Sequence, residues 1–339
     1  MSTPPLVRPH PPTPPKQTPY AILTAHLDIH AFQILEIEIL PSSLPLSPTT
    51  SSPFLTDALS LGLPKRTLTE VFLSARRLFH SPNATPTDRH QATRALLLFD
   101  PEHLTAANSR KRRLLDLSRA ADECGGHGEL LRALTQELAF LSSLLTSPLD
   151  RHTKSPTLWH HRYWVVRTFA ARFIHPGARA GAGGFQTDGN AAPAGGVRSL
   201  WLSELAVVMR AGDRHPRNYY AWNYARRLFR FLSSEGSRDA ATGPTITTAE
   251  TTERIQRWCF QHPRDISGWA VLAFLLEQHA RDQGLSGKDD EDVDRLRRKV
   301  AVETEGWVRK FAWEGESVVW FLRTMGMDAG RTGKAQGVG

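Results

Sequence analysis

The amino-acid sequence predicts an all-α protein, a right-handed superhelical solenoid built from helical hairpins. A short string with a proline, a polar residue and a tryptophan recurs along the chain of 339 residues. The anchors of its copies, at positions 107, 159, 222, 269 and 320, lie 47 to 63 residues apart. Repetition at such a period is typical of stacked supersecondary units, each of which cannot bury its apolar face alone.

The anchors are four tryptophans and an alanine that takes the tryptophan place. They are Ala107, Trp159, Trp222, Trp269 and Trp320. Proline is tolerated in the first turn of a helix, and a nearby Asn, Asp, Ser or Thr can cap the exposed amides. Each anchor then falls about one turn inside a helix. A tryptophan there can fill the gap to the preceding hairpin, so we interpret the anchors as structural residues of the repeat core.

An arginine follows three residues after the anchor in three copies, as Arg110, Arg162 and Arg323. A spacing of three residues puts the arginine on the same side of the helix as the anchor. We expect it to reach carbonyls or carboxylates of the neighbouring turn. The copies at Trp222 and Trp269 lack this arginine.

Helices are expected in pairs that follow the anchors. Their ranges are 67–80, 91–99, 104–120, 130–145, 156–174, 200–210, 218–232, 251–261, 267–279, 292–311 and 317–325. The first of them carries an apolar stripe and a capping box formed by Thr67 and Glu70. Partial alternation of apolar residues over 30–40 predicts an extended edge segment instead of a helix.

The chain is predicted to form one α-helical repeat domain over 20–325. A proline-rich disordered tail is expected at 1–19 and a glycine-rich one at 326–339. Flexible insertions are expected near 177–197, 233–247 and 282–291, where small and polar residues gather. Residues 181–184 are glycine-rich but lack the Lys-Ser/Thr of a phosphate loop, so an insertion is favoured there.

The repeated strings resemble the protein prenyltransferase alpha-subunit repeat, the helical hairpin of farnesyl- and geranylgeranyltransferase alpha subunits. That repeat carries a Pro-Lys-Asn-Tyr-x-x-Trp-x-x-Arg-like signature, which 216–222 matches closely. Residues 159–164 match its tryptophan-to-arginine core, and Glu137-Leu138 and Glu204-Leu205 match the pair that opens the preceding helix. The resemblance covers about 90–325 and is closest to the repeat-containing proteins of this family, which implies a tetratricopeptide-like solenoid.

The resemblance implies an alpha-type subunit of a geranylgeranyl- or farnesyltransferase, inactive without a beta subunit that it wraps as a heterodimer. The beta subunit would hold the zinc, the isoprenoid diphosphate and the protein substrate, and no cofactor is expected in this chain. The family's lysine and tyrosine near the diphosphate match Arg217 and Tyr219 here. A cation would stabilise charge on the leaving group, and a phenol could donate a hydrogen bond to it.

Further residues are expected to bind substrate or partner on the concave face of the solenoid. They are Asn218, Tyr220, His160, Tyr163 and Arg264. For the tyrosines at 219 and 220, packing against the next hairpin or the partner stays an alternative to catalysis. His160 and His161 are adjacent in a predicted helix and point to different sides, so no metal site is expected.

Two other functions stay open from the sequence. A helical-repeat scaffold without transferase activity would explain the degenerate copies and the missing arginines. A nucleic-acid-binding solenoid would explain the net charge of +8 and the run 110–113, which reads Arg-Lys-Arg-Arg. Arginines are spread over all the predicted helices, so no nucleic-acid partner is expected. The charge would equally suit an acidic partner or a lipid diphosphate.

Composition indicates a cytoplasmic protein. No apolar run approaches the roughly 18 residues that a membrane span needs. Residues 1–19 hold many prolines and no apolar stretch of the kind that a signal peptide has. The chain has two cysteines, Cys124 and Cys259, too far apart in the sequence for a metal motif, and a disulfide is not expected.

Overall fold

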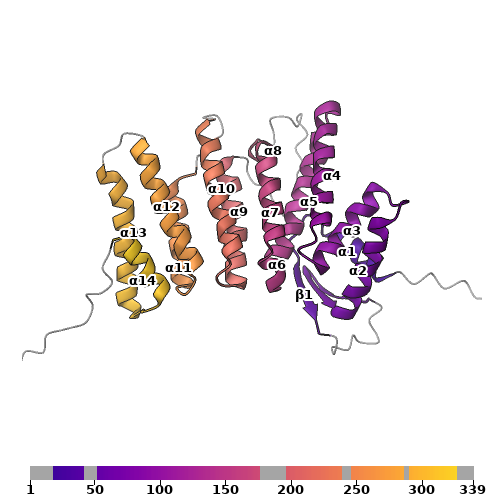
Figure 1. The fold of residues 1–339 in the computed structure, drawn as a ribbon, viewed down its shortest axis with the longest axis horizontal. Coiled ribbons are helices and arrows are strands. Elements are labelled where there is room, and N and C mark those ends of the chain that lie inside the picture. The colour runs from indigo at the N-terminus through magenta and orange to yellow at the C-terminus, as the bar shows by residue number, and fades with distance from the viewer. Residues whose placement is uncertain (1–17, 42–51, 176–195, 239–245, 286–289, 327–339) are drawn as a thin grey trace, which may run out of the picture.

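The structure is a computed structural model that describes residues 18–41, 52–175, 196–238, 246–285 and 290–326. Within these ranges the chain is all-α apart from one small sheet, which confirms the predicted class. The helices follow one another along an elongated row, from the N-terminal helices to α14 at the opposite end (Figure 1). The superhelical solenoid and its right hand stay predictions.

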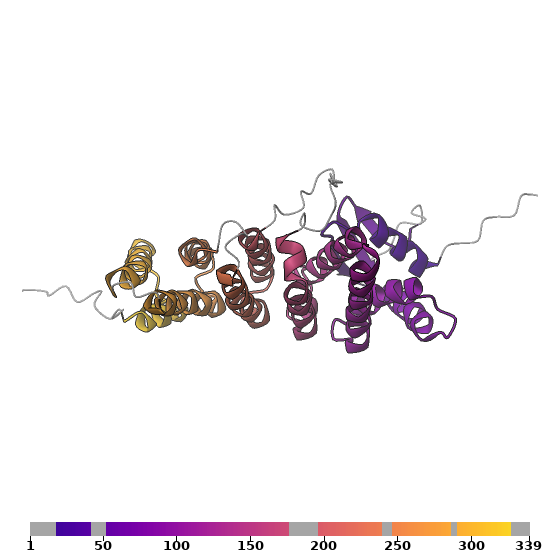
Figure 2. The same ribbon diagram turned by 90° about the horizontal axis from the view of Figure 1, so that it is seen from above.

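Five hairpins form the row, and we number them in chain order. They are α3 (Pro86–Phe99) with α4 (Leu104–Cys124), α5 (His127–Leu145) with α7 (Pro156–Thr168), α9 (Val197–Arg214) with α10 (Tyr219–Arg238), α11 (Thr248–Gln261) with α12 (Ile266–Leu285), and α13 (Asp290–Phe311) with α14 (Glu316–Thr324). The second helices contact one another in succession, from α4 through α7, α10 and α12 to α14. Seen from above, the row is long and shallow (Figure 2).

The N-terminal part holds α1 (Pro19–Ile29), α2 (Lys65–His80) and a sheet of β1 (Glu36–Leu40), β2 (Leu55–Asp57) and β3 (Ser60–Pro64). The strand order is β1-β3-β2, with β1 parallel to β3 and β2 antiparallel to it. The extended segment expected within 30–40 is therefore present as β1, at an edge of the sheet. The helix α1 begins inside the expected tail, because the side chain of Thr18 accepts a hydrogen bond from the amide of Ala21 and caps it.

Several expected helix ends are wrong. The capping box at Thr67 is absent, since α2 begins at Lys65 directly after Pro64 and has no side-chain cap. The capping box lies instead at the start of α3, where Thr85 and Asp88 satisfy each other's backbone amides. This box starts the helix five residues before the expected position of 91.

The expected helix over 156–174 is two helices, α7 and α8 (Ala170–Ile174), with Phe169 between them. A further short helix, α6 (Asp150–Thr153), precedes α7. Parts of the expected insertions are helical, because α10 continues to Arg238, α12 to Leu285, and α13 begins at Asp290. Most of the insertion near 177–197 and most of both tails lie outside the described residues.

The anchors at Ala107, Trp159, Trp222 and Trp269 are at most 3% exposed. Trp320 differs, since it is 41% exposed while its neighbour Phe321 is fully buried. The ring of Phe321 lies 5.0 Å from that of Trp269, so Phe321 fills the gap that Trp320 was expected to fill. The two residues are adjacent in the sequence. The buried anchor of the last hairpin is Phe321, so the expectation that Trp320 is the anchor is wrong.

A repeated set of hydrogen bonds links the turns between the two helices of successive hairpins. The capping side chain of each of three turns reaches the turn before it. Ser155 Oγ donates to the carbonyl of Pro101, Asn218 Nδ2 donates to the carbonyl of Thr153, and Asp265 Oδ2 accepts from the amide of Arg217. We call this set the cap ladder. The bond to Asp265 holds Arg217 at a φ of 59°, in the left-handed region.

Two buried ion pairs join neighbouring hairpins. Arg110 donates two hydrogen bonds to Glu137, at 2.8 and 2.6 Å, and Arg162 donates two to Glu204, at 2.6 and 2.9 Å. All four residues are at most 2% exposed. The arginines that follow Ala107 and Trp159 thus reach carboxylates, as the spacing predicted.

Candidate functional site

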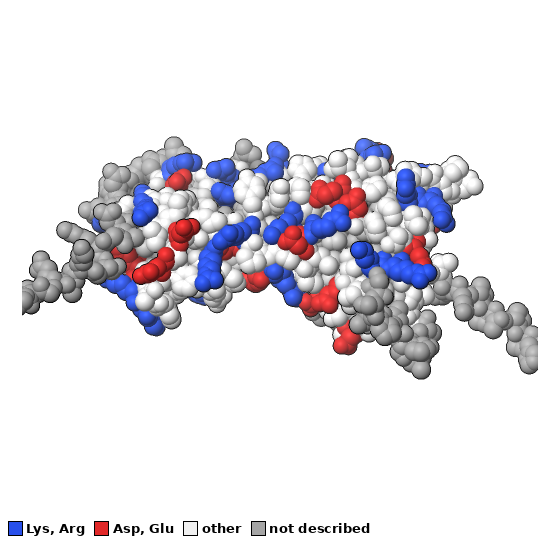
Figure 3. Space-filling view, turned by 60° about the horizontal axis from the view of Figure 1, so that its bottom comes forward, with Lys and Arg blue, Asp and Glu red and all other residues white. Residues whose placement is uncertain are grey.

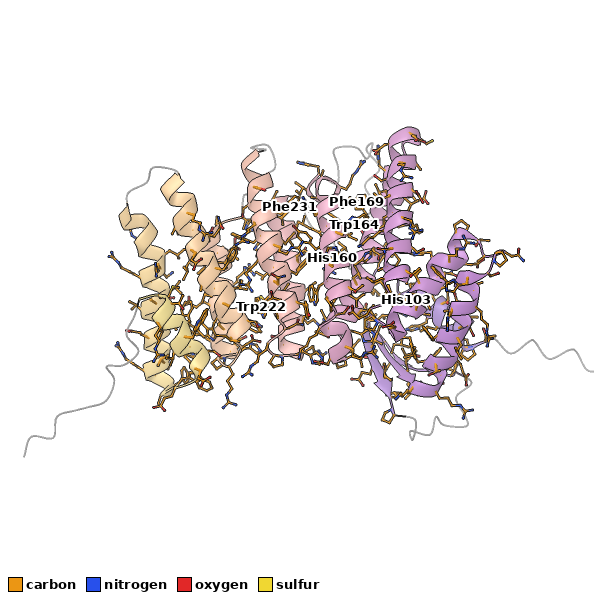
Figure 4. The ribbon with its side chains drawn as sticks, viewed as in Figure 1. His103, His160, Trp164, Phe169, Trp222 and Phe231 are labelled. Atoms are coloured by element: carbon orange, nitrogen blue, oxygen red, sulfur yellow. The ribbon has the colours of Figure 1, made fainter. Side chains whose placement is uncertain are left out.

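A groove of about 390 Å³ crosses the second helices of the first three hairpins. We call it the central groove. Its lining comes from α4, α7 and α10: Leu104, Ala107, Asn108, Lys111, Pro156, Thr157, Trp159, His160, Tyr163, Tyr220, Asn223, Tyr224 and Arg227. His160 lies midway along α7, one turn from Trp164 (Figure 4). The volume lies at the lower end of the range of small-molecule pockets.

The repeat register explains which residues line the groove. The residue directly after each anchor does so in all three hairpins, as Asn108, His160 and Asn223. Residues four positions after an anchor lie on the same helical face, and two of these, Lys111 and Tyr163, line the groove as well. Because the anchors themselves are buried, the groove has a fixed floor and a polar wall that can vary.

The charged side chains of the lining are all basic. Lys111 and Arg227 line the groove with His160, and no Asp or Glu is among its lining residues. Lys111 Nζ lies 5.6 Å from the ring centre of Trp164, and the Arg227 guanidinium lies 4.1 Å from that of Tyr163. Burial lowers the pKa of Lys111. Burial, followed by the charges of Lys111 and Arg227, lowers the pKa of His160, which favours its neutral form at pH 7.

The floor of the groove is fixed by the glutamates of the buried ion pairs. Each glutamate also bonds a residue two positions after the anchor of its own hairpin: Glu137 contacts His161 Nε2 at 2.8 Å, and Glu204 accepts from the Tyr224 hydroxyl. Burial alone would raise the pKa of Glu137, but Arg110 and His161 outweigh it and hold that pKa far below its usual value. Burial and the charge of Glu204 raise the pKa of Tyr224 well above its usual value. The groove is therefore preorganised.

The structure brings together three of the residues expected to bind substrate or partner. His160, Tyr163 and Tyr220 line the central groove, and Tyr220 is 40% exposed. Arg217 and Tyr219 are exposed at the start of α10 but are not among the lining residues.

The other two expected binding residues lie elsewhere. Asn218 is fully buried and caps α10, so its side chain is not available to a ligand, and its expected binding role is wrong. Arg264 is exposed in the turn between α11 and α12 of the fourth hairpin, with its guanidinium 5.6 Å from the ring centre of Trp313.

Lys111 and Arg227 escaped the sequence analysis as groove residues. Lys111 was assigned only to the basic run 110–113, and the positions four residues after the anchors were not compared between copies. Counted from Ala107, Lys111 corresponds to Tyr163 of the next hairpin. Register against the anchor is the signal that would have found it.

The basic run 110–113 does not form a single basic patch. Arg110 is 2% exposed and bound to Glu137, whereas Arg112 is exposed on the other side of α4. On the face that Figure 3 displays, Lys and Arg side chains are interspersed with Asp and Glu. A large field of one sign, which nucleic-acid binding favours, is absent from that face.

The described residues contain no cluster of three or more His, Cys, Asp or Glu side chains that could hold a metal. Cys124 is exposed and Cys259 buried, and both are free thiols. In the part of the chain that the structure covers, no helix is both long enough and apolar enough to cross a membrane.

Paired helices, buried tryptophans and arginine–glutamate pairs define a helical-repeat protein. The protein prenyltransferase alpha subunit repeat matches residues 134–169, a stretch that includes Glu137, Trp159 and Arg162. The ECM9 middle domain matches residues 192–300, from α9 into α13. The resemblance to the prenyltransferase alpha-subunit repeat family is thus confirmed.

Similar curated proteins carry the same names. Protein ECM9 of Saccharomyces cerevisiae is 24% identical over 76% of this chain and 58% of its own length. Protein prenyltransferase alpha subunit repeat-containing protein 1 of Homo sapiens is 28% identical over 55% of this chain and 39% of its own. That of Danio rerio is 25% identical over 59% and 40%. The matched part is thus between 39% and 58% of each relative's length.

Proposed function

We propose that this chain is the alpha-type subunit of a cytoplasmic protein prenyltransferase, a transferase that works as a heterodimer with a beta subunit. The central groove carries this proposal, because its lining charges are all basic and it lies on the face formed by the second helices of the repeats. A basic groove with phenol and imidazole groups suits an acidic partner surface or a lipid diphosphate. The zinc of such an enzyme would lie in the beta subunit.

In this proposal, Lys111 and Arg227 supply the positive charge that faces the partner or the diphosphate. Tyr163 and Tyr220 supply hydroxyl groups beside them. Arg217 and Tyr219 stay candidates for diphosphate contact, because both are exposed at the start of α10, next to the tyrosine that lines the groove. The isoprenoid and the protein that accepts it would be chosen by the complex.

Co-expression with prenyltransferase beta subunits tests the proposal. We expect one of them to purify with this chain in equal amounts and the complex to transfer a geranylgeranyl or farnesyl group to a cysteine-bearing substrate. Neither protein alone should do so. Lack of a beta subunit in the purified material would contradict the proposal.

A second candidate is a helical-repeat scaffold without transferase activity. It is favoured by the divergence of the later copies of the repeat. Trp320 is exposed, and Ala225 and Leu272 occupy the positions of the arginine that follows the anchor. A stable complex with a beta subunit that has no transfer activity towards any cysteine-bearing substrate would support the scaffold instead of the enzyme.

A further inference from the structure

A second cavity, of about 280 Å³, lies at the N-terminal end of the row, apart from the central groove. We call it the N-terminal cavity. It is enclosed by the end of α1, the segment before β1, and the facing sides of α3, α4 and α5. Leu27, Leu35, Ile37 and Phe140 form an apolar part of its wall.

Basic side chains from two packed helices line the N-terminal cavity. His90 and Arg94 are one turn apart on α3, and Arg110 and Arg113 are one turn apart on α4. Each pair therefore shares a helical face, and the two faces meet across the cavity. Asp28 is the one acidic residue among the lining residues.

Two of the three arginines are already paired. Arg94 Nη2 donates to Asp28 Oδ1 at 2.6 Å, and Arg110 binds Glu137. Arg113 is partly buried, and among the described residues no carboxylate lies within ion-pairing distance of it. Arg113 is thus the one arginine of the lining that makes no salt bridge among the described residues, although the charges of Glu137 and Glu129 act on it from a greater distance.

Two buried donor groups in the cavity lack partners. Arg94 Nε and His90 Nδ1 are both buried without a hydrogen bond. The side chain of Arg94 is only 8% exposed. A buried polar atom without a partner destabilises a protein, and a bound acceptor would relieve that cost. Burial lowers the pKa of His90 to about 2, and the charges of Arg110 and Arg113 contribute in the same direction.

We propose that the N-terminal cavity binds the phosphoryl group of a small phosphorylated molecule, with Arg113 as its main cation. Arg94 Nε and His90 Nδ1 donate to the remaining oxygens. A phosphoryl group offers three acceptor oxygens, as three separate donor side chains require, whereas a carboxylate offers two. The cavity volume suits a small molecule, and the apolar wall suits a hydrocarbon or aromatic part attached to the phosphate.

The test is calorimetric titration of the whole chain with inorganic phosphate and with phenyl phosphate. We expect saturable binding of both, tighter for phenyl phosphate because of the apolar wall. Arg113→Gln should weaken binding by about tenfold or more, since Arg113 is the one lining guanidinium that makes no salt bridge among the described residues. Arg112→Gln is the matched control, because it removes the same charge from the exposed side of the same helix and should leave binding unchanged.

Three results would overturn the proposal. They are no saturable binding of either ligand up to about 10 mM, equal binding by Arg113→Gln, and benzoate binding as tight as phenyl phosphate. If Arg113→Gln unfolds, the ring resonances of His90 in the unaltered protein serve instead, and they should shift on addition of phosphate but not of chloride. The test needs no beta subunit, so its result is independent of the transferase proposal.

Discussion

Arg162 and Glu204 form a buried ion pair between the second and third hairpins, and the next junction replaces both residues together. Ala225 follows Trp222 as Arg162 follows Trp159. Thr251 precedes His262 by the interval that separates Glu204 from His215. At that junction the ring of Trp258 lies 4.7 Å from that of Trp222. This junction thus has an aromatic contact and no buried ion pair. Because the arginine and the glutamate are both replaced, neither charge is buried without its partner.

We expect Arg162→Ala to destabilise the protein by about 3–5 kcal/mol, because it leaves Glu204 buried without its cation. The double variant Arg162→Ala/Glu204→Thr copies the residues of the next junction and should recover much of that loss. Unfolding in urea measures both variants. A double variant less stable than Arg162→Ala would contradict this account of the junction.

The anchors provide a matched pair of substitutions. Trp222→Ala should cost about 3–5 kcal/mol, since it opens a cavity between hairpins. Trp320→Ala should cost less, about 1 kcal/mol, because Trp320 is 41% exposed and its removal leaves a smaller void. Equal losses for both variants would show that α14 packs differently from this description.

Asn218 can be tested for its two separate bonds. Asn218→Asp keeps the acceptor that caps α10 but loses the donor to the carbonyl of Thr153. We expect this variant to be less stable by about 1–3 kcal/mol, because a charge enters a buried position and the carbonyl of Thr153 keeps only the hydrogen bond from Trp159 Nε1. Asn218→Ala loses both bonds, and its melting temperature should lie below that of Asn218→Asp at a pH where the new carboxyl group is neutral. A rise in the melting temperature of Asn218→Asp as the pH falls would show the cost of its buried charge.

Buried histidines make stability depend on pH. His90 has a pKa of about 2 in the folded state, against an ordinary value of 6.5. The unfolded chain therefore binds a proton below pH 6.5 that the folded chain does not, and stability falls as the pH falls. From pH 7 to 5 the loss from His90 is about 2 kcal/mol. Burial likewise lowers the pKa of His152 and His161 and adds to the same trend.

The substitution that isolates this effect is His90→Gln, which should flatten the decline in unfolding free energy between pH 7 and 5 by about 2 kcal/mol. His80→Gln, on the exposed end of α2, is the control and should leave the slope unchanged. A slope that is the same in all three proteins would show that His90 is protonated when folded.

The central groove predicts a graded effect on transfer in a complex with a beta subunit. Lys111→Ala and Arg227→Ala should each lower the rate of prenyl transfer by about tenfold or more, if their charges face the diphosphate or its partner surface. Arg112→Ala removes a neighbouring exposed charge and should not. A decrease with Arg217→Ala but not with the groove variants would move the site to the turn before α10.

The sequence predicted those parts of the molecule that repeat. Trp159, Trp222 and Trp269 marked the hairpins because each sits in a similar string, and even Ala107 was found by its setting. The N-terminal part was largely missed, since α1, β2 and β3 belong to no repeat and β2 is three residues long. The groove was found only in part, because His160 and Tyr163 stand beside a tryptophan while Lys111 stands beside an alanine.

The cap ladder runs along one edge of the row and makes its two edges unequal. At that edge Ser155, Asn218 and Asp265 each tie one turn to the turn before it. The hairpins follow one another at the other edge, from α8 to α9, from α10 to α11 and from α12 to α13, and the described residues there include no capping residue of the ladder. Insertions and deletions in evolution should therefore accumulate along the second edge. Along the first, a change in the length of one turn would disturb the spacing of its neighbours.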